Sequence, residues 1–71
     1  MTLKNINNKK DTMKVEFIVV RDNKMLFCNW YKDWKSFIRT KTYKNYIDNE
    51  LQYCTVKYYN EMPYISCCVS Y

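Results

Sequence analysis

The chain has 71 residues and a net charge of +5, and it contains neither glycine nor histidine. This length fits one small domain, which buries only about 60% of the surface of its unfolded chain and therefore has a thin stability margin. The lack of glycine excludes phosphate-binding loops and dinucleotide fingerprints, and the lack of histidine excludes Ser-His and Cys-His nucleophile pairs and zinc sites that use histidine.

Residues 1–12 are mostly polar and predict a flexible tail in front of a single domain at residues 13–71. This start has no apolar core of the signal-peptide type. The longest apolar runs, at residues 17–20 and 25–28, are far too short to cross a membrane. These features predict a cytoplasmic protein whose cysteines stay reduced.

Residues 13–30 predict a β-hairpin, because two runs of β-branched and aromatic residues flank a short polar turn. Asp22 and Asn23 would take the left-handed backbone conformation that glycine usually adopts in such turns. Side chains alternate along a strand, so a regular two-residue turn fixes which residues share a face. The first face would hold Val15, Phe17, Val19, Leu26, Cys28 and Trp30. The second would hold Ile18, Val20, Met25 and Phe27.

The next segment predicts an amphipathic helix with a basic outer side. The apolar residues with helical spacing are Trp30, Trp34, Phe37 and Ile38. The basic residues opposite them are Lys32, Lys35 and Arg39. Asn29 or Asp33 can cap the start of the helix. A straight continuation would turn the later apolar residues away from this stripe, so we expect a break near residues 40–42 and a short second helical turn.

Residues 51–59 and 64–71 alternate again and predict a second hairpin, closed by a turn at residues 60–63. Antiparallel pairing would place Cys54, Val56 and Tyr58 beside Ile65, Cys67 and Val69. The predicted fold class is therefore α+β, a small ββαββ domain. Its antiparallel sheet of two hairpins would carry one helix, broken near residues 40–42, on one face.

Four cysteines, Cys28, Cys54, Cys67 and Cys68, show no Cys-x-x-Cys spacing. Adjacent strand residues point to opposite faces, so Cys67 and Cys68 would not converge on one metal. We therefore expect no metal and no other cofactor. Cys28, Cys54 and Cys67 are expected to be small core residues, and Cys54 lies close enough to Cys67 in the predicted pairing for oxidation in vitro.

One helix covers one face of a four-stranded sheet, so the opposite face is predicted to be a protein interface. Its residues are Ile18, Met25, Phe27, Tyr53, Tyr59 and Tyr64. Tyrosine, phenylalanine and methionine are enriched at interfaces, and the partner would be a second copy or another protein. The alternative is that the tail or residues 43–51 fold over this face.

Positive charge predicts a second kind of surface. Residues 30–45 carry five basic residues and one acidic residue, so they account for +4 of the net charge of +5. The residues predicted to contact nucleic acid or an acidic partner are Lys32, Lys35, Arg39 and Lys57. Together with the strand tyrosines they could bind RNA or a single nucleic-acid strand by phosphate contacts and base stacking. The plain alternative is a solvated basic helix face.

The abundance of lysine, asparagine and tyrosine is typical of an AT-rich genome. In size, composition and lack of motifs the chain resembles small phage or mobile-element proteins that bind host factors, including anti-CRISPR and other anti-defence inhibitors. Its seven acidic residues are scattered and suggest no catalytic pocket. The leading interpretation is a non-enzymatic protein in the cytoplasm of a host cell. It would inhibit or modulate a host protein or nucleoprotein complex, and binding of RNA or single strands is the alternative.

Overall fold

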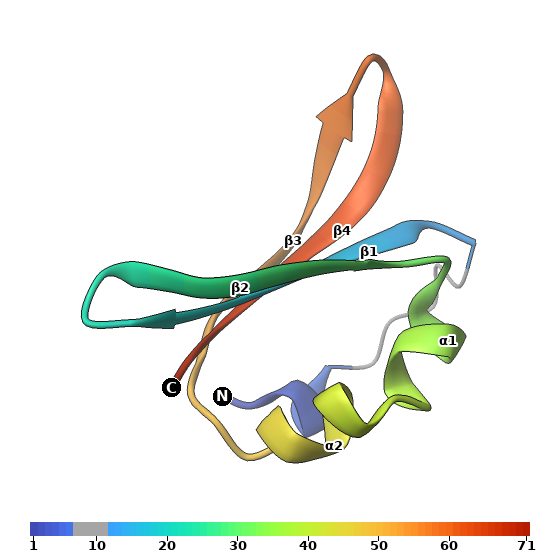
Figure 1. Ribbon diagram of the computed structural model, residues 1–71. Helices are drawn as coiled ribbons and strands as arrows, with labels where there is room; N and C mark the ends of the chain where they lie inside the picture. The colour runs from blue at the N-terminus through green and yellow to red at the C-terminus, as the bar shows by residue number, and fades with distance from the viewer. Residues whose placement is uncertain (7–11) are drawn as a thin grey trace.

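The computed structural model describes residues 1–6 and 12–71. A four-stranded sheet is built from β1 (Lys14–Arg21), β2 (Lys24–Tyr31), β3 (Leu51–Tyr59) and β4 (Met62–Ser70). Two short helices, α1 (Trp34–Ile38) and α2 (Lys41–Tyr46), lie on one side of it, near the 3-10 turn η1 (Leu3–Asn5) (Figure 1). The prediction of a small ββαββ domain of the α+β class is confirmed.

The strands lie in the order β2-β1-β4-β3, with the two antiparallel hairpins joined through their inner strands. The pair that joins them, β1 with β4, is parallel. The sheet is therefore mixed and not wholly antiparallel as predicted. A parallel pair needs a long connection that brings the chain back to its starting end, and here β2, the helices and β3 supply it.

Both hairpins close with two residues in the left-handed region, Asp22 and Asn23 in the first and Asn60 and Glu61 in the second. Two consecutive left-handed residues form the turn whose twist matches that of the flanking strands. The predicted use of Asp22 and Asn23 is confirmed. The second turn is tighter than the predicted turn at residues 60–63, because Tyr59 already pairs with Met62.

A one-residue bulge in β2 reverses the predicted faces of the first hairpin. Val20 pairs with Met25, but Val19 pairs with Phe27, so Leu26 is the extra residue. Such a slip moves every following side chain to the other face. The prediction that Phe27 lies beside Ile18 on the uncovered face is wrong, since Phe27 lies on the helix side. Cys28 and Trp30, expected on the helix side, belong to the opposite face, whereas Leu26 stands at the bulge and has no partner in the register with β1.

The hydrophobic core lies between the sheet and the helices. Its centre is Phe37, whose ring lies 5.0 Å from the rings of Phe17 and Tyr31 and 5.2 Å from that of Trp34. Only part of the predicted helical stripe is in this core, because Trp34 is 5% exposed whereas Ile38 is 37% exposed. Trp30, the first residue of the predicted stripe, lies in β2 and not in a helix.

Two side-chain caps account for the predicted break between the helices. The Asp33 carboxylate accepts a hydrogen bond from the Ser36 backbone N–H at 2.8 Å and starts α1. The Thr40 hydroxyl accepts one from the Tyr43 N–H at 3.1 Å and starts α2. The cap at Asp33 and the break near residue 40 are both confirmed.

Residues 1–6 pack against the domain, which differs from the expected flexible tail. The Leu3 side chain is fully buried in the core cluster. The Met1 carbonyl accepts a hydrogen bond from the Leu51 N–H at 2.9 Å, and Lys4 Nζ lies 2.7 Å from Asp48 Oδ1. The part of the predicted tail at residues 7–11 lies outside the described residues.

Cys54 and Cys67 are opposite each other on β3 and β4, with their Cα atoms 4.1 Å apart, and form a disulfide. This differs from the expectation that all the cysteines are reduced. Cys28 and Cys68 are free thiols. Cys28 is half-buried on the face away from the helices, so its predicted place in the core is wrong, for the same reason as for Phe27.

Candidate binding surface on the open face of the sheet

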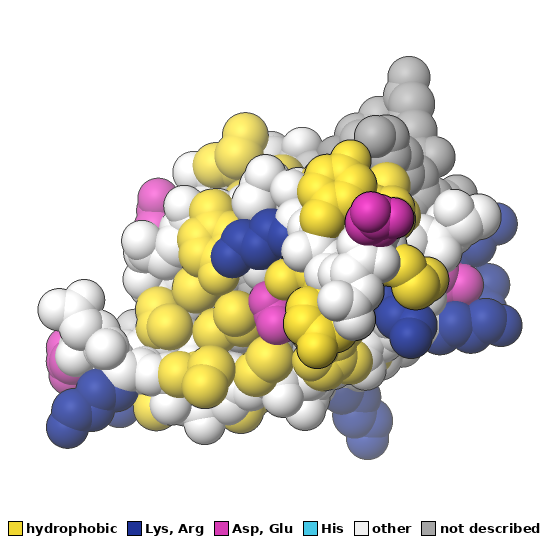
Figure 2. All heavy atoms as spheres, turned by 90° about the horizontal axis from the view of Figure 1, so that it is seen from above, with side chains coloured by type: hydrophobic (Ala, Val, Ile, Leu, Met, Phe, Trp, Pro, Cys, Tyr) yellow, Lys and Arg dark blue, Asp and Glu magenta, His cyan; other side chains and the backbone are white. Residues whose placement is uncertain are grey.

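We call the side of the sheet turned away from α1 and α2 the open face. Four of its apolar residues keep between 53% and 72% of their surface exposed: Met25, Trp30, Tyr59 and Met62. Figure 2 shows hydrophobic side chains spread across this face over both hairpins, with few charged groups among them. Monomeric proteins seldom leave so continuous an apolar surface in water, so it is the strongest candidate for a binding surface.

Five of the six predicted interface residues lie on the open face: Ile18, Met25, Tyr53, Tyr59 and Tyr64. The sixth, Phe27, packs in the core, with its ring 6.2 Å from that of Phe17 and 5.7 Å from that of Tyr46. Sequence reasoning missed Trp30 because of the bulge, and it missed Met62 because it placed that residue in a turn.

A groove of about 850 Å³ opens at one end of the open face. Its apolar walls come from Trp30 on β2 and from Tyr59, Met62 and Tyr64 near the tip of the second hairpin. The rings of Trp30 and Tyr64 lie 5.1 Å apart and join the two walls. This shape and lining could receive a projecting apolar or aromatic side chain of a partner.

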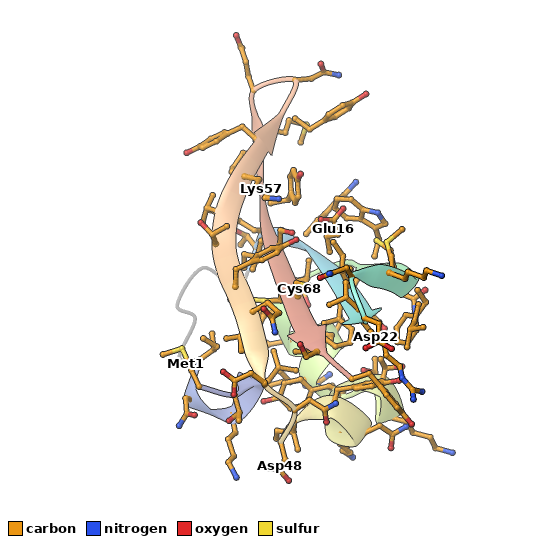
Figure 3. The ribbon with its side chains drawn as sticks, turned by 90° about the vertical axis from the view of Figure 1, so that its left-hand side faces the viewer. Met1, Glu16, Asp22, Asp48, Lys57 and Cys68 are labelled. Atoms are coloured by element: carbon orange, nitrogen blue, oxygen red, sulfur yellow. A yellow bond between two sulfur atoms is a disulfide. The ribbon has the colours of Figure 1, made fainter. Side chains whose placement is uncertain are left out.

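The charged residues of the open face are few, and most are basic. Lys14 and Lys32 line the groove, together with Glu16. The Glu16 carboxylate accepts a hydrogen bond from the Ser66 hydroxyl at 2.8 Å, which satisfies the only fully buried polar side chain among the described residues. Lys57 Nζ lies 5.0 Å from the centre of the Tyr53 ring. Figure 3 shows Lys57, Cys68 and Glu16 on three neighbouring strands.

The free thiols Cys28 and Cys68 flank Ile18 on the open face. Burial raises the pKa of the Cys68 thiol, and burial together with the negative charge of Glu16 raises the pKa of the Cys28 thiol. A raised pKa keeps a thiol protonated at neutral pH, where it is a poor nucleophile.

The structure does not bring the four predicted basic contacts together. Lys35 and Arg39 belong to the helical segment on the covered side of the sheet, whereas Lys57 lies on the open face. Lys32 lines the groove at the end of the open face. The basic helix and the tyrosine-lysine strand surface are therefore two separate surfaces on opposite sides of the sheet.

Within residues 1–6 and 12–71 no three histidine, cysteine, aspartate or glutamate side chains are grouped as metal ligands. In the same part of the chain no helix has the length and apolar character needed to cross a membrane. Comparisons with known protein families, with characterised proteins and with solved structures found no match to this chain.

Proposed function

We propose that this protein is a non-enzymatic binding protein that docks on another protein through its open face. The observation that carries the proposal is the exposed apolar surface that runs across both hairpins, from Met25 and Trp30 to Tyr59 and Met62. Each exposed aromatic side chain can bury about 150–250 Å², and burial contributes about 25 cal/mol per Å². Methionine, tyrosine and tryptophan are also the residue types that interfaces favour.

The groove indicates the chemistry of the partner. Its aromatic walls favour an apolar anchor, and Lys14 and Lys32 beside them favour acidic groups next to that anchor. A protein segment with an apolar side chain flanked by acidic residues meets both conditions. The rest of the surface, around Ile18 and Met25, offers aliphatic contact area for the remainder of such a partner.

A single nucleic-acid strand fits this surface less well. Bases stack on aromatic rings, whereas two of the four most exposed apolar residues of the open face, Met25 and Met62, offer no ring. The basic residues Lys35 and Arg39, which would hold phosphates, lie on the other side of the sheet. One strand could not use both surfaces without wrapping around the domain, so the observations favour protein docking.

The cellular setting is part of the same proposal. The composition supports an origin in a phage or another mobile element with an AT-rich genome, acting in the cytoplasm of its host. The partner would then be a host protein or nucleoprotein complex that this chain inhibits or modulates. In a reducing cytoplasm Cys54 and Cys67 would be two thiols packed side by side, still within the β-ladder.

The test is a pull-down from host lysate with the tagged protein, with and without nuclease treatment. Trp30→Glu places a charge in the groove, and Tyr71→Glu is the matched control, since Tyr71 is an exposed aromatic residue on the helix side, next to Tyr46. We expect a partner band that survives nuclease, is lost with Trp30→Glu and is kept with Tyr71→Glu. A band that nuclease removes, and that depends on Lys35 and Arg39, would show that nucleic acid is the partner.

A further inference from the structure

The outer edge of β3 offers a row of backbone hydrogen-bonding groups. In an antiparallel pair, residues alternate between positions that bond the partner strand and positions whose N–H and C=O point away from it. The Cα separation of 4.1 Å marks Cys54–Cys67 as a non-hydrogen-bonded pair. Tyr58 pairs with Pro63 four residues further along β3, which is again a non-hydrogen-bonded position. Proline fits there because it has no N–H to donate to the partner strand. The outward-pointing groups of β3 therefore belong to Cys54, Val56 and Tyr58.

No other residue among those described pairs with these outward groups. At the start of β3 the edge is closed, because the Leu51 N–H donates to the Met1 carbonyl at 2.9 Å. From Tyr53 to Tyr59 the edge is regular, with no proline and no bulge. Figure 1 shows that the tip of this hairpin projects away from the helices. Natural edge strands are usually protected by bulges, prolines or projecting charges, and β2 has such a bulge at Leu26.

The single charge on β3 does not protect its edge. Lys57 is the only charged residue between Leu51 and Tyr59, and its Nζ lies over the Tyr53 ring of the same strand. The ammonium group is thus directed along its own strand, over the open face. The edge is left both unpaired and approachable.

We propose that a second copy of this chain pairs antiparallel with β3, with Val56 of one copy opposite Val56 of the other. The outward-pointing residues lie symmetrically about Val56, so Cys54 of each copy then lies opposite Tyr58 of the other. Each of these three pairs exchanges two hydrogen bonds, and every outward group of both copies is satisfied. Two-fold symmetry makes such an interface self-complementary. The same register places Tyr53 beside Tyr59 of the second copy, an aromatic pair on the open face.

The dimer would join two four-stranded sheets into one sheet of eight strands. Because the two-fold axis runs perpendicular to the sheet, both helix layers lie on one side and both open faces on the other. Tyr58 and Tyr59, which are 71% and 72% exposed, would supply most of the buried side-chain area. A contact formed by one strand is small for a stable dimer, so we expect assembly to depend on protein concentration.

Sedimentation equilibrium over a range of protein concentrations tests the pairing. The expected mass rises from 8.8 kDa towards twice that value. Val56→Lys places like charges opposite each other at the two-fold axis and should lower the association constant at least tenfold. Met25→Lys is the matched control, since it adds the same charge to an exposed residue of the other edge strand, and it should leave association unchanged.

A charge-exchange experiment tests the register. Copies carrying Val56→Lys and copies carrying Val56→Glu should each be monomeric, but an equimolar mixture should form a heterodimer, because the opposite charges then face each other across the axis. Circular dichroism of each variant checks that the fold is kept. A wild-type chain that is monomeric at all concentrations would overturn the proposal. A dimer that Met25→Lys disrupts and Val56→Lys does not would also overturn it, in favour of pairing through the open face.

Discussion

Replacing Leu3 by alanine would show how strongly the N-terminal segment supports the domain. The Leu3 side chain is fully buried in the core cluster between the segment and the sheet. The change removes the equivalent of about three methylene groups, or about 2.4 kcal/mol of transfer free energy, and the cavity left behind raises the cost to about 2–5 kcal/mol. A domain of this size has a total free energy of unfolding of about 4–11 kcal/mol, so the expected loss is a large fraction of it.

Thermal unfolding followed by circular dichroism measures this loss. At about 4–8 °C per kcal/mol, the midpoint of Leu3→Ala should fall by roughly 10–40 °C. Detachment of residues 1–6 would limit the cost, and hydrogen exchange at the Leu51 amide detects it, because that amide is bonded to the Met1 carbonyl. Lys4→Ala is the neighbouring control and should change little, since its ion pair with Asp48 is exposed. An unchanged midpoint for Leu3→Ala, with rapid exchange at Leu51 in the wild type, would refute the docking of this segment.

Other perturbations separate the core, the helix cap and the cross-link. In urea unfolding, Trp34→Ala should cost about 3–5 kcal/mol, whereas Trp30→Ala, on the open face, should cost under about 1 kcal/mol; equal losses would contradict the assigned core. The hydrogen bond from the Ser36 backbone N–H lowers the pKa of Asp33 below its usual 3.8. The ionised cap therefore stabilises the fold at pH values above 3.8, and this stabilisation is lost as the pH falls through the lowered pKa. Asp33→Asn removes this charge, so its free energy of unfolding should lie below that of the wild type at neutral pH and converge on it as the pH falls through the lowered pKa; a difference that does not change with pH would contradict this role. The disulfide between Cys54 and Cys67 closes a loop of 13 residues, and its reduction should lower the free energy of unfolding by up to about 3 kcal/mol. The far-ultraviolet circular dichroism spectrum should stay native after reduction. Loss of the native spectrum at room temperature would show that the fold depends on the cross-link.

The hairpins and the broken helix could be predicted because their signals are local. Asp22 and Asn23 tolerate the left-handed turn, and Asp33 and Thr40 are good helix caps. The tight second turn was harder to predict, because Glu61 is an unusual residue at a left-handed position. The faces of the second hairpin were still assigned correctly, since turns of two and four residues give the same alternation.

The bulge at Leu26 could not be predicted, because both possible registers of the first hairpin look acceptable. β2 carries apolar residues on both sides, so a slip of one residue exchanges one apolar set for another and leaves no mismatch in the pattern. Three of the predicted placements, those of Phe27, Cys28 and Trp30, failed for this single reason. Much of the candidate surface was nevertheless predicted, because β3 and β4 supply half of it and their residues lie on the faces expected from the sequence.

The parallel pairing of β1 with β4 is a long-range property that no local pattern specifies. Both strands contain apolar residues on both faces, which is typical of strands in the interior of a sheet, but this does not give their relative direction. The docking of residues 1–6 was missed for a related reason. Leu3 and Ile6 are too few to form a recognisable apolar pattern, and only the assembled core shows where they fit.

The position of β4 has a consequence for how the protein is made. β4 is synthesised after every other strand, yet it occupies the interior of the sheet between β1 and β3. Glu16 and Ser66, which bond across this central pair, are 50 residues apart in the chain. An isolated hairpin is only marginally stable in water, so the earlier strands have no lasting partner while β4 is missing. The complete sheet therefore cannot form before β4 has been synthesised. A ribosome that stalls or terminates before β4 would release an unfolded chain, open to aggregation and to proteases.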